Sequence, residues 1–182
     1  MNQDMMSRMS IPAWVCVALL SSPVWAQQKQ PLNVSGDGVK SRWVQQNLID
    51  VDDVPGHQIR NYEIQRTFTG SSQPVVDGER VVEGWVRGYS NYTNGIGPVL
   101  SYTTWVTDKG SKIFLESVGT SETQPTETGS KRGTYHGTSR IVGGNGRFAS
   151  LRGLLVDISK FDTDPKVGYS TVDSHGDYWF EK

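Results

Sequence analysis

Three glutamates and one histidine stand in strand-like segments of the sequence, where they could carry acid–base chemistry: Glu63, Glu83, Glu116 and His136. A carboxyl group that a sheet buries away from water often has a raised pKa, which suits it to transfer protons near neutral pH. The alternation of a strand does not say which face is buried, and the outer face is the ordinary place for a polar strand residue. Both interpretations stay open, and the catalytic residues are unassigned.

Aromatic side chains in the same segments could line a cavity for a small apolar or aromatic molecule. A closed barrel of about eight strands has an interior just large enough for packed side chains or one small ligand. The alternative is that most of these rings pack in the core, or lie on the outer face against a partner subunit. The candidate ligand-binding residues are Trp85, Tyr89, Tyr102, Trp105 and Tyr135.

The motifs of conventional hydrolases and metalloenzymes are missing from the sequence. There is neither a G-x-S-x-G nucleophile elbow nor an H-E-x-x-H zinc motif. The single cysteine, Cys16, lies in an N-terminal apolar run, so the rest of the chain offers no thiol nucleophile and no disulfide. We therefore predict that the protein uses no cofactor.

Two sets of possible metal ligands do not form a recognisable site. His57, His136 and His175 could meet in space around zinc, but nothing in their spacing requires it. The aspartates of residues 50–53 could bind calcium, although this segment lacks the glycine and the distal glutamate of an EF-hand. We predict no metal site.

A glycine-rich stretch, IVGGNGRFASLRG, contains the G-x-G-x-x-G/A spacing of a dinucleotide-binding turn at Gly144, Gly146 and Ala149. Such a turn opens a helix of about ten residues or more and is followed by a parallel strand. Here Gly153 comes five residues after Phe148, and the β-rich run LLVDIS follows at once. There is no room for the helix, so we predict a turn between two strands.

Strand signals fill the chain from His57 onward. In VVEGWVRGYSNY, large residues alternate with glycine and valine, and Asp77-Gly78 and Asp108–Gly110 are signals of hairpin turns. Seven or eight strands with short connections favour an antiparallel barrel or sandwich. We predict an all-β fold with a single antiparallel eight-stranded closed barrel over residues 57–182, preceded by an irregular segment over residues 27–56.

The N-terminus has the features of a secretory signal peptide over residues 1–26. Arg8 precedes an apolar run over residues 11–20, and small residues including Ala26 follow. The run is too short for the roughly 20 residues of a spanning helix, and a retained anchor is the alternative. We predict an exported protein, periplasmic or extracellular, with no membrane span in its mature part. A net charge of -1 gives no reason to expect nucleic acid as a partner.

Residues 137–153, GTSRIVGGNGRFASLRG, resemble a stretch shared by allene oxide cyclase-like barrels, and more distantly the G-G-T-G-x-F of dirigent proteins. Asn145 replaces the usual threonine and Ser150 a usual glycine, and the terminal GDYWF is similar to the closing strand of bacterial members. The positions that match are Gly137, Thr138, Ile141, Gly143, Gly144, Gly146, Arg147, Phe148, Ala149, Arg152 and Gly153.

The resemblance implies a closed eight-stranded barrel with a shape like that of the lipocalins, and often a homodimer or homotrimer formed by outward apolar residues. We interpret the glycine-rich stretch itself as structural. Gly143 and Gly144 can take positive φ, Phe148 can plug one end of the barrel, and Arg147 and Arg152 can pair with carboxylates or carbonyls.

Three functions remain open for such a barrel. We predict a secreted protein that holds a small apolar or aromatic molecule in its interior. The resemblance adds two alternatives, a cofactor-independent isomerase or cyclase of the allene oxide cyclase type, and a dirigent-like or structural interaction barrel without catalysis.

Overall fold

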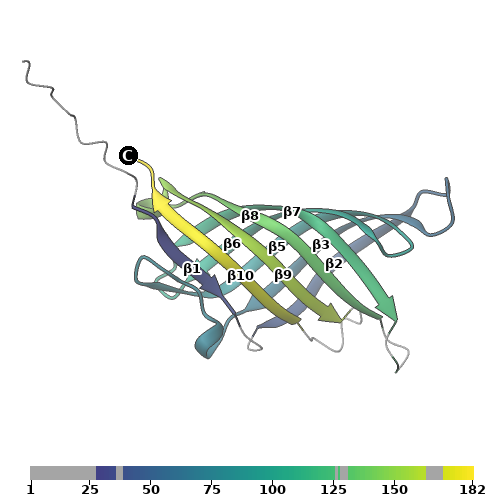
Figure 1. Cartoon of the computed structure of the whole chain (residues 1–182), viewed down its shortest axis with the longest axis horizontal. Coiled ribbons are helices and arrows are strands. Elements are labelled where there is room, and N and C mark those ends of the chain that lie inside the picture. The colour runs from purple at the N-terminus through teal and green to yellow at the C-terminus, as the bar shows by residue number, and fades with distance from the viewer. Residues whose placement is uncertain (1–27, 36–38, 126, 128–130, 163–169) are drawn as a thin grey trace, which may run out of the picture.

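The computed structural model describes residues 28–35, 39–125, 127, 131–162 and 170–182, and this part of the chain is all-β (Figure 1). Apart from two single-turn 3-10 helices, η1 (Gly70–Ser72) and η2 (Gly146–Phe148), its regular elements are strands. They are β1 (Gln30–Val34), β2 (Lys40–Asp50), β3 (His57–Thr67), β4 (Val75–Val76), β5 (Glu79–Thr93), β6 (Gly97–Thr107), β7 (Lys112–Pro125), β8 (Lys131–Gly144), β9 (Leu151–Asp162) and β10 (Ser170–Phe180).

The strands form one antiparallel sheet in the order β1-β10-β9-β8-β7-β6-β5-β3-β2, with β4 paired to β5 alone. Neighbours in the sequence are therefore neighbours in the sheet, except that β1 reaches the far end and pairs with β10. The two edge strands, β1 and β2, are consecutive in the chain, and the sheet curls on itself (Figure 1). Within the described residues, no ladder of hydrogen bonds joins β1 to β2.

The all-β antiparallel prediction is confirmed, but the details differ in two ways. The described part of the chain holds ten strands instead of eight, in a sheet that hydrogen bonds do not close. Residues 27–56 are not a separate irregular segment, because they contribute β1 and β2 to the sheet. The pairing of β1 explains why the sequence did not predict this strand. Gln30 pairs with Tyr178, and no local pattern near residue 30 indicates a partner so far along the chain.

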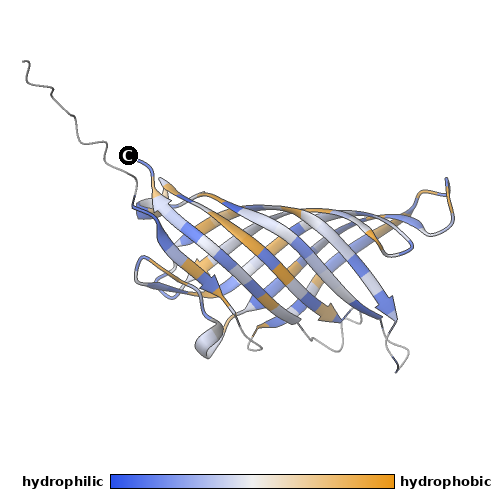
Figure 2. Cartoon of the chain, viewed as in Figure 1, coloured by the Kyte–Doolittle hydropathy of each residue, from blue (hydrophilic) through white to orange (hydrophobic). Residues whose placement is uncertain are grey.

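Alternation along the strands gives the sheet an inner and an outer face. On β9, Leu151, Gly153, Leu155, Asp157 and Ser159 are buried, and most of the residues between them are exposed. Hydrophobic and hydrophilic residues accordingly follow one another along the strands in Figure 2. Because successive side chains point to opposite faces, every inward residue is matched by an inward residue on the next strand.

The apolar core gathers at the end of the sheet where β6, β8 and β10 finish and β7 and β9 begin. Phe148, Ile113, Ile141, Leu151 and Leu32 are all at most 1% exposed there. Burying side chains of this size stabilises the fold by roughly 1.5–3 kcal/mol each. This cluster fills one end of the curled sheet, which we call the packed end.

The glycine-rich stretch forms the tight connection between β8 and β9 at the packed end. Gly143 has a φ of 139°, which favours glycine, while Gly144 is needed for space, because a Cβ there would lie 2.3 Å from the carbonyl oxygen of Lys112. Phe148 is fully buried and stacks on Phe180. The 3-10 turn η2 leads directly into β9, so the structure excludes the long helix that a dinucleotide site needs.

The two arginines of this stretch fix the connection to its surroundings. Arg152 donates hydrogen bonds to the carbonyl oxygens of Val142, Ala149 and Leu151, and its Nη2 lies 2.8 Å from Glu181. Arg147 reaches the β4–β5 hairpin, where it donates to the side chain of Asp77. The stretch therefore joins three parts of the packed end.

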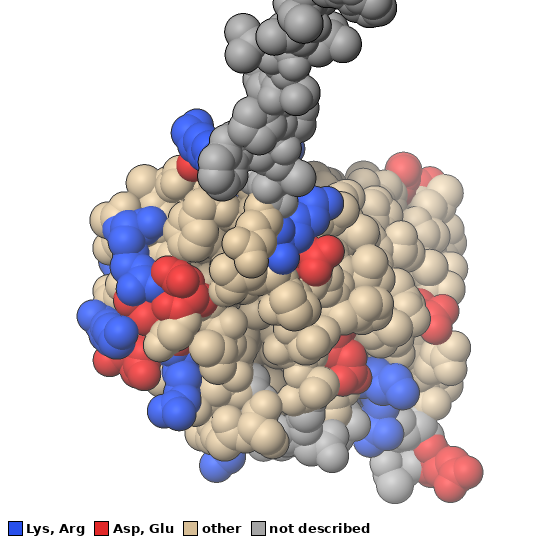
Figure 3. Space-filling model, turned by 60° about the vertical axis from the view of Figure 1, so that its left-hand side comes forward, with Lys and Arg blue, Asp and Glu red and all other residues tan. Residues whose placement is uncertain are grey.

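Positive and negative side chains are interspersed on the face seen in Figure 3, with broad areas of uncharged residues between them. None of the helices in the described residues has the length and apolar character that crossing a membrane would require. The predicted signal peptide over residues 1–26 lies outside the described residues.

Candidate functional site

The inner face of the sheet encloses a small cavity, which we call the interior cavity. Its volume is about 110 Å³, and inward side chains of nine strands, all except β4, contribute to its walls. Apolar walls come from Ile64, Val86, Leu115, Leu155 and Val172, among others. Polar groups lie between them, so the interior is not a purely apolar space.

A cation and a carboxyl group face each other across this cavity. Arg66 projects from β3 and Asp157 from β9, and the charge of each influences the pKa of the other. Asp157 is 7% exposed, and burial raises the pKa of its carboxyl group although Ser139 and Ser174 donate hydrogen bonds to it. Burial also lowers the pKa of the Arg66 guanidinium, which nevertheless remains charged at neutral pH. The structure records no ion pair between the two.

Two tyrosine hydroxyls lie near the same pair. Burial raises the pKa of Tyr62 to about 12 and also raises the pKa of Tyr135, so both phenols stay protonated and can donate hydrogen bonds. Both tyrosines also interact electrostatically with Arg66. The guanidinium of Arg66 and the phenols of Tyr62 and Tyr135 therefore all lie in the cavity walls.

Glycines on the same strand or on a neighbouring strand make room for these rings. A Cβ at Gly88 would lie 2.2 Å from Cζ of Tyr62, and a Cβ at Gly137 would lie 2.1 Å from the hydroxyl oxygen of Tyr135. Phe161 lies over Gly133 in the same way, at 2.4 Å. The glycines of β5 and β8 therefore position the aromatic walls of the cavity.

Four buried polar atoms of the cavity walls have no hydrogen-bond partner within the part of the chain that the structure describes. They are Oγ of Ser41, Nε of Arg66, Oγ of Ser121 and the hydroxyl of Tyr135. Buried polar groups are normally hydrogen-bonded, so a concentration of exceptions around one cavity is informative. These atoms are free to hold a guest molecule.

A second arginine in the cavity walls is already engaged. The Arg60 guanidinium lies 5.2 Å from the ring centroids of Trp43, Tyr62 and Tyr92. It also donates to Ser90 and to the Tyr92 hydroxyl, at 3.3 Å each. Because its charge lies among aromatic faces and hydroxyls, Arg60 is not available in the way that Arg66 is.

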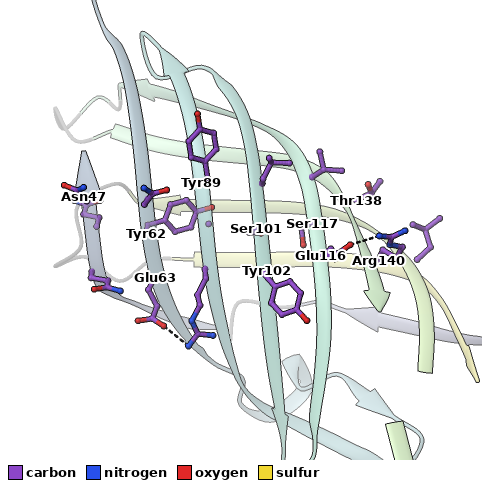
Figure 4. Close-up of a pocket in the computed structure, with 18 residues that line it drawn as sticks. Asn47, Tyr62, Glu63, Tyr89, Ser101, Tyr102, Glu116, Ser117, Thr138 and Arg140 are labelled. Atoms are coloured by element: carbon purple, nitrogen blue, oxygen red, sulfur yellow. Dashed lines mark hydrogen bonds and ion pairs between the residues drawn. The ribbon is translucent and has the colours of Figure 1, made fainter. Parts of the chain in front are cut away.

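The outer face of the sheet carries a larger and more open hollow of about 1030 Å³, which we call the outer groove (Figure 4). Its charged side chains are paired with each other: Arg87 with Glu63 at 2.8 Å, and Arg140 with Glu116 at 2.6 Å. An open groove whose charges are already paired holds a small molecule less well than an enclosed cavity with free donors.

The candidate ligand-binding residues are divided between the two faces. Trp105 and Tyr135 line the interior cavity. Tyr89 and Tyr102 line the outer groove, and Trp85 lies on the same outward face of β5 as the exposed Arg87. Three of the five rings therefore do not face the interior.

The candidate catalytic residues also lie outside the interior cavity. Glu63 and Glu116 line the outer groove in their ion pairs, and Glu83 accepts a hydrogen bond from Gln65 on that side of the sheet. His136 is exposed on β8. The structure brings none of them together around the cavity, and the interior carboxyl beside Arg66 belongs to Asp157.

Arg66 and Asp157 were not among the candidates, although the sequence held a signal for the arginine. Tyr62 and Ile64 alternate on one face of β3, Phe68 follows its end at the same parity, and Arg66 shares that parity. An arginine on the apolar face of a strand indicates a buried charge. The burial of Asp157 was harder to predict, because the apolar and polar residues around it do not indicate which face of the strand is inward.

The histidines do not meet. His57 lies in the β2–β3 hairpin, with its Nδ1 2.5 Å from Asp53 and its Nε2 2.6 Å from Oδ1 of Asn91. The bond to Asp53 raises the pKa of His57. Across the described ranges, no group of three or more histidine, cysteine, aspartate or glutamate side chains could hold a metal ion.

Comparisons of this chain with protein-family models, with curated proteins and with solved structures gave no match. The resemblance of residues 137–153 to allene oxide cyclase-like barrels therefore stays a prediction.

Proposed function

We propose that this chain is a small-molecule-binding protein whose curled sheet acts as a closed barrel and holds one compact guest. The observation that carries the proposal is the set of four unpartnered polar atoms around the interior cavity. Ligand pockets are typically apolar spaces with a few placed polar groups, and the walls described above have that composition.

Contacts across the edges of the sheet support closure. Asp157 pairs with Ser174, and Ser174 pairs with Val34 at the end of β1. At the beginning of β2, Ser41 pairs with Arg66. Arg66 and Asp157, which belong to the rows of residues that lead to these two edges, interact electrostatically, as a closed sheet would allow. Val34 and Val39, on either side of that seam, are both buried.

The volume limits the guest to a compact molecule. A dry cavity of about 150 Å³ in another protein binds benzene, so a cavity of about 110 Å³ suits a ligand no larger than a single unsubstituted ring. A long acyl chain does not fit this space. The apolar or aromatic guest expected from the sequence remains suitable only at this small size.

Native mass spectrometry of protein from its own host tests the proposal, since a retained guest adds its mass to the chain. Thr103→Phe should abolish retention, because Thr103 lines the interior cavity and a phenyl group would fill it. Thr138→Phe is the matched control, because Thr138 pairs with Val118 on the outer face and lines the outer groove. Equal retention by both variants, once each is shown to be folded, contradicts the proposal.

Cofactor-independent isomerisation is a second candidate function, favoured by one observation. The carboxyl group of Asp157 faces the cavity with a raised pKa, as a general acid or base requires. Once the guest is known, its conversion can be followed by chromatography. Asp157→Asn should keep binding and lose turnover; turnover at the wild-type rate would leave binding as the function.

Export is proposed from residues 1–26 alone. N-terminal sequencing of the protein recovered from its host should begin at Gln27, directly after Ala26. A start at the initiator methionine or within residues 2–20 would contradict a cleaved signal peptide.

A further inference from the structure

We propose that the outer groove binds a neutral oligosaccharide, whose sugar rings pack on two tyrosines and whose hydroxyl groups bond to free amide side chains. This inference goes beyond the proposed function, because it concerns the face of the sheet opposite the interior cavity. It is drawn from the side chains of β2, β3, β5 and β6 that line one part of the groove, which we call the polar half. They are Gln45, Asn47, Asn61, Glu63, Arg87, Tyr89 and Tyr102.

The register of the sheet places these side chains in two adjacent rows on the outer face. Paired residues of an antiparallel sheet share a face and lie about 4.5–5.5 Å apart, so one extended ligand can contact both rows. The first row is Gln45, Glu63, Arg87 and Tyr102, and the second is Asn47, Asn61 and Tyr89.

The amide side chains of the polar half are available to a ligand. Gln45, Asn47 and Asn61 are exposed, and no side chain in the described residues is hydrogen-bonded to them. Each amide carries an acceptor oxygen and two donor hydrogens. A sugar hydroxyl likewise donates and accepts, so neighbouring hydroxyls can use both ends of one amide. The free groups therefore match a ligand rich in hydroxyls.

Two tyrosine rings provide an apolar surface among these amides (Figure 4). Tyr102 is 41% exposed, and it stacks on Phe114 with the ring planes 29° apart. Tyr89 pairs with Leu100, two residues from Tyr102, so the tyrosines are diagonal neighbours on the outer face. A sugar ring with equatorial hydroxyls has flat faces of C–H groups, which pack on an aromatic ring while its rim reaches polar groups.

The charges of the polar half favour an uncharged ligand. Arg87 and Glu63 lie 2.8 Å apart, so the cation and the carboxylate of this half neutralise each other. A charged ligand would lose hydration against this pair without gaining a free counter-charge. A neutral saccharide loses less hydration and can still bond to the outer atoms of the pair.

The size of the groove suits a chain of sugars better than a compact molecule. Its volume of about 1030 Å³ is at the upper end of the range for ligand sites, and it is open to solvent. Its other half carries Leu100, Val118 and Leu154, which offer no hydrogen bonds from their side chains. We therefore assign the oligosaccharide to the polar half alone.

Isothermal titration of the full folded chain with cellotetraose tests the inference, because all hydroxyls on the rings of this neutral tetramer are equatorial. The corresponding tetramers of glucosamine and of glucuronic acid, at about pH 6, are its cationic and anionic counterparts. Cellotetraose should bind about tenfold more tightly than either. A wild type that does not bind cellotetraose, or that prefers a charged tetramer, overturns the inference.

Two truncations locate the site. Tyr102→Ala should weaken cellotetraose binding about tenfold, because it removes one of the two aromatic surfaces. Ile158→Ala is the matched control, at a position 36% exposed on β9 and outside the groove, and should leave binding unchanged. Equal affinities of the two variants overturn the site. If Tyr102→Ala does not fold, Asn61→Ala decides: a loss of about two- to tenfold supports the site, and an unchanged affinity overturns it.

A third variant separates this inference from the proposed function. Thr103→Phe fills the interior cavity and should bind cellotetraose as the wild type does. Loss of cellotetraose binding in this variant, once it is shown to be folded, overturns the outer site. Cellotetraose binding without a retained guest in native mass spectrometry contradicts the proposed function alone, and a retained guest without cellotetraose binding overturns this inference alone.

Discussion

Asp157 is the residue at which burial and charge oppose each other most directly. Its carboxyl group lies inside the sheet, where desolvation favours the protonated form, while Ser139, Ser174, Arg66 and His175 favour the ionised form. Desolvation is the largest of these influences, so the pKa is raised above 3.8. Tyr135 and Tyr62 interact with Arg66 in the same space. The folded chain therefore holds this proton more tightly than the unfolded chain.

This predicts a particular dependence of stability on pH. Between the unfolded pKa of 3.8 and the raised folded value, the folded state binds more protons, so the free energy of unfolding falls as pH rises through that window. Asp157→Asn removes this contribution. The difference in unfolding free energy between wild type and variant, measured by chemical denaturation from about pH 4 to 8, should therefore shift in favour of the variant as pH rises.

Asp173→Asn is the matched control, because Asp173 is exposed on the next strand. It removes a carboxyl group from the outer face, so the contribution of Asp157 to the pH dependence of stability should remain. A wild type that gains stability relative to Asp157→Asn as pH rises would mean that ionised Asp157 is stabilised by Arg66, and would contradict the raised pKa.

At the scale of the strands, glycine and aromatic residues act as pairs. Gly88 on β5 lies beneath Tyr62 on β3, its partner in the register. Gly88→Ala would put a methyl group into the ring and should destabilise the fold by about 1–3 kcal/mol, the usual cost of overpacking. The measurement is the free energy of unfolding of the variant.

A double-mutant cycle assigns that cost to the pair. In a Tyr62→Ala background the ring is absent, so Gly88→Ala should cost much less than in the wild type. Equal costs in the two backgrounds would show that Gly88 is needed for its backbone and not for the space that it gives to Tyr62.

The packed end depends on a link between two hairpins. Arg147, in the turn between β8 and β9, donates to Asp77 and lies 3.5 Å from Glu79, which is 3% exposed and accepts a hydrogen bond from Thr107 at 2.6 Å. Arg147→Gln leaves Glu79 buried without its cation and should lower the melting temperature clearly. Breaking a pair that involves a buried charge costs more than breaking an exposed pair.

Arg140→Gln is the control for this link. Arg140 pairs with Glu116, and the two side chains are 67% and 49% exposed, so the change should cost only about 0–1 kcal/mol. Melting curves of the two variants that coincide would show that Arg147 does not hold the β4–β5 hairpin in place.

Local signals in the sequence predicted the turns well. Asp77 and Gly78 both have positive φ in the hairpin between β4 and β5, and Gly110 has it in the turn between β6 and β7, as their residue types indicated. Such turns depend on two or three residues. The strand β1 depends instead on pairing with β10, and no local pattern contains that information.

The candidate site was less predictable for a related reason. Alternation showed that β5 has two faces, but only the whole curled sheet decides which face becomes the interior. Trp85 and Tyr89 were therefore chosen for their rings and lie outside, while Arg66, on the apolar parity of β3, lies inside. Which polar residues face one another across the cavity is decided only by the complete sheet, so the sequence of a single strand does not predict it.

At the scale of the whole molecule, the outer face carries exposed apolar residues that could contact a partner protein. Leu100 pairs with Val118, Val118 with Thr138, and Thr138 with Val156 across four strands. The three apolar members are 53%, 55% and 46% exposed, and we call them the outer apolar stripe. Large exposed apolar patches often mark a binding surface. The homodimer or homotrimer expected from the family resemblance would use such a surface.

We therefore predict self-association through the outer apolar stripe. Sedimentation velocity over a range of protein concentrations should show a dimer or trimer for the wild type. Val118→Lys should shift the chain to monomer, because a charge at the centre of the stripe would have to be buried.

Val75→Lys, at a position 50% exposed on β4 and outside the stripe, should leave association unchanged. A wild type that stays monomeric, or a dimer that both variants retain, would place the contact elsewhere. Because the stripe lies on the face opposite the interior cavity, association and guest binding should vary independently in these variants.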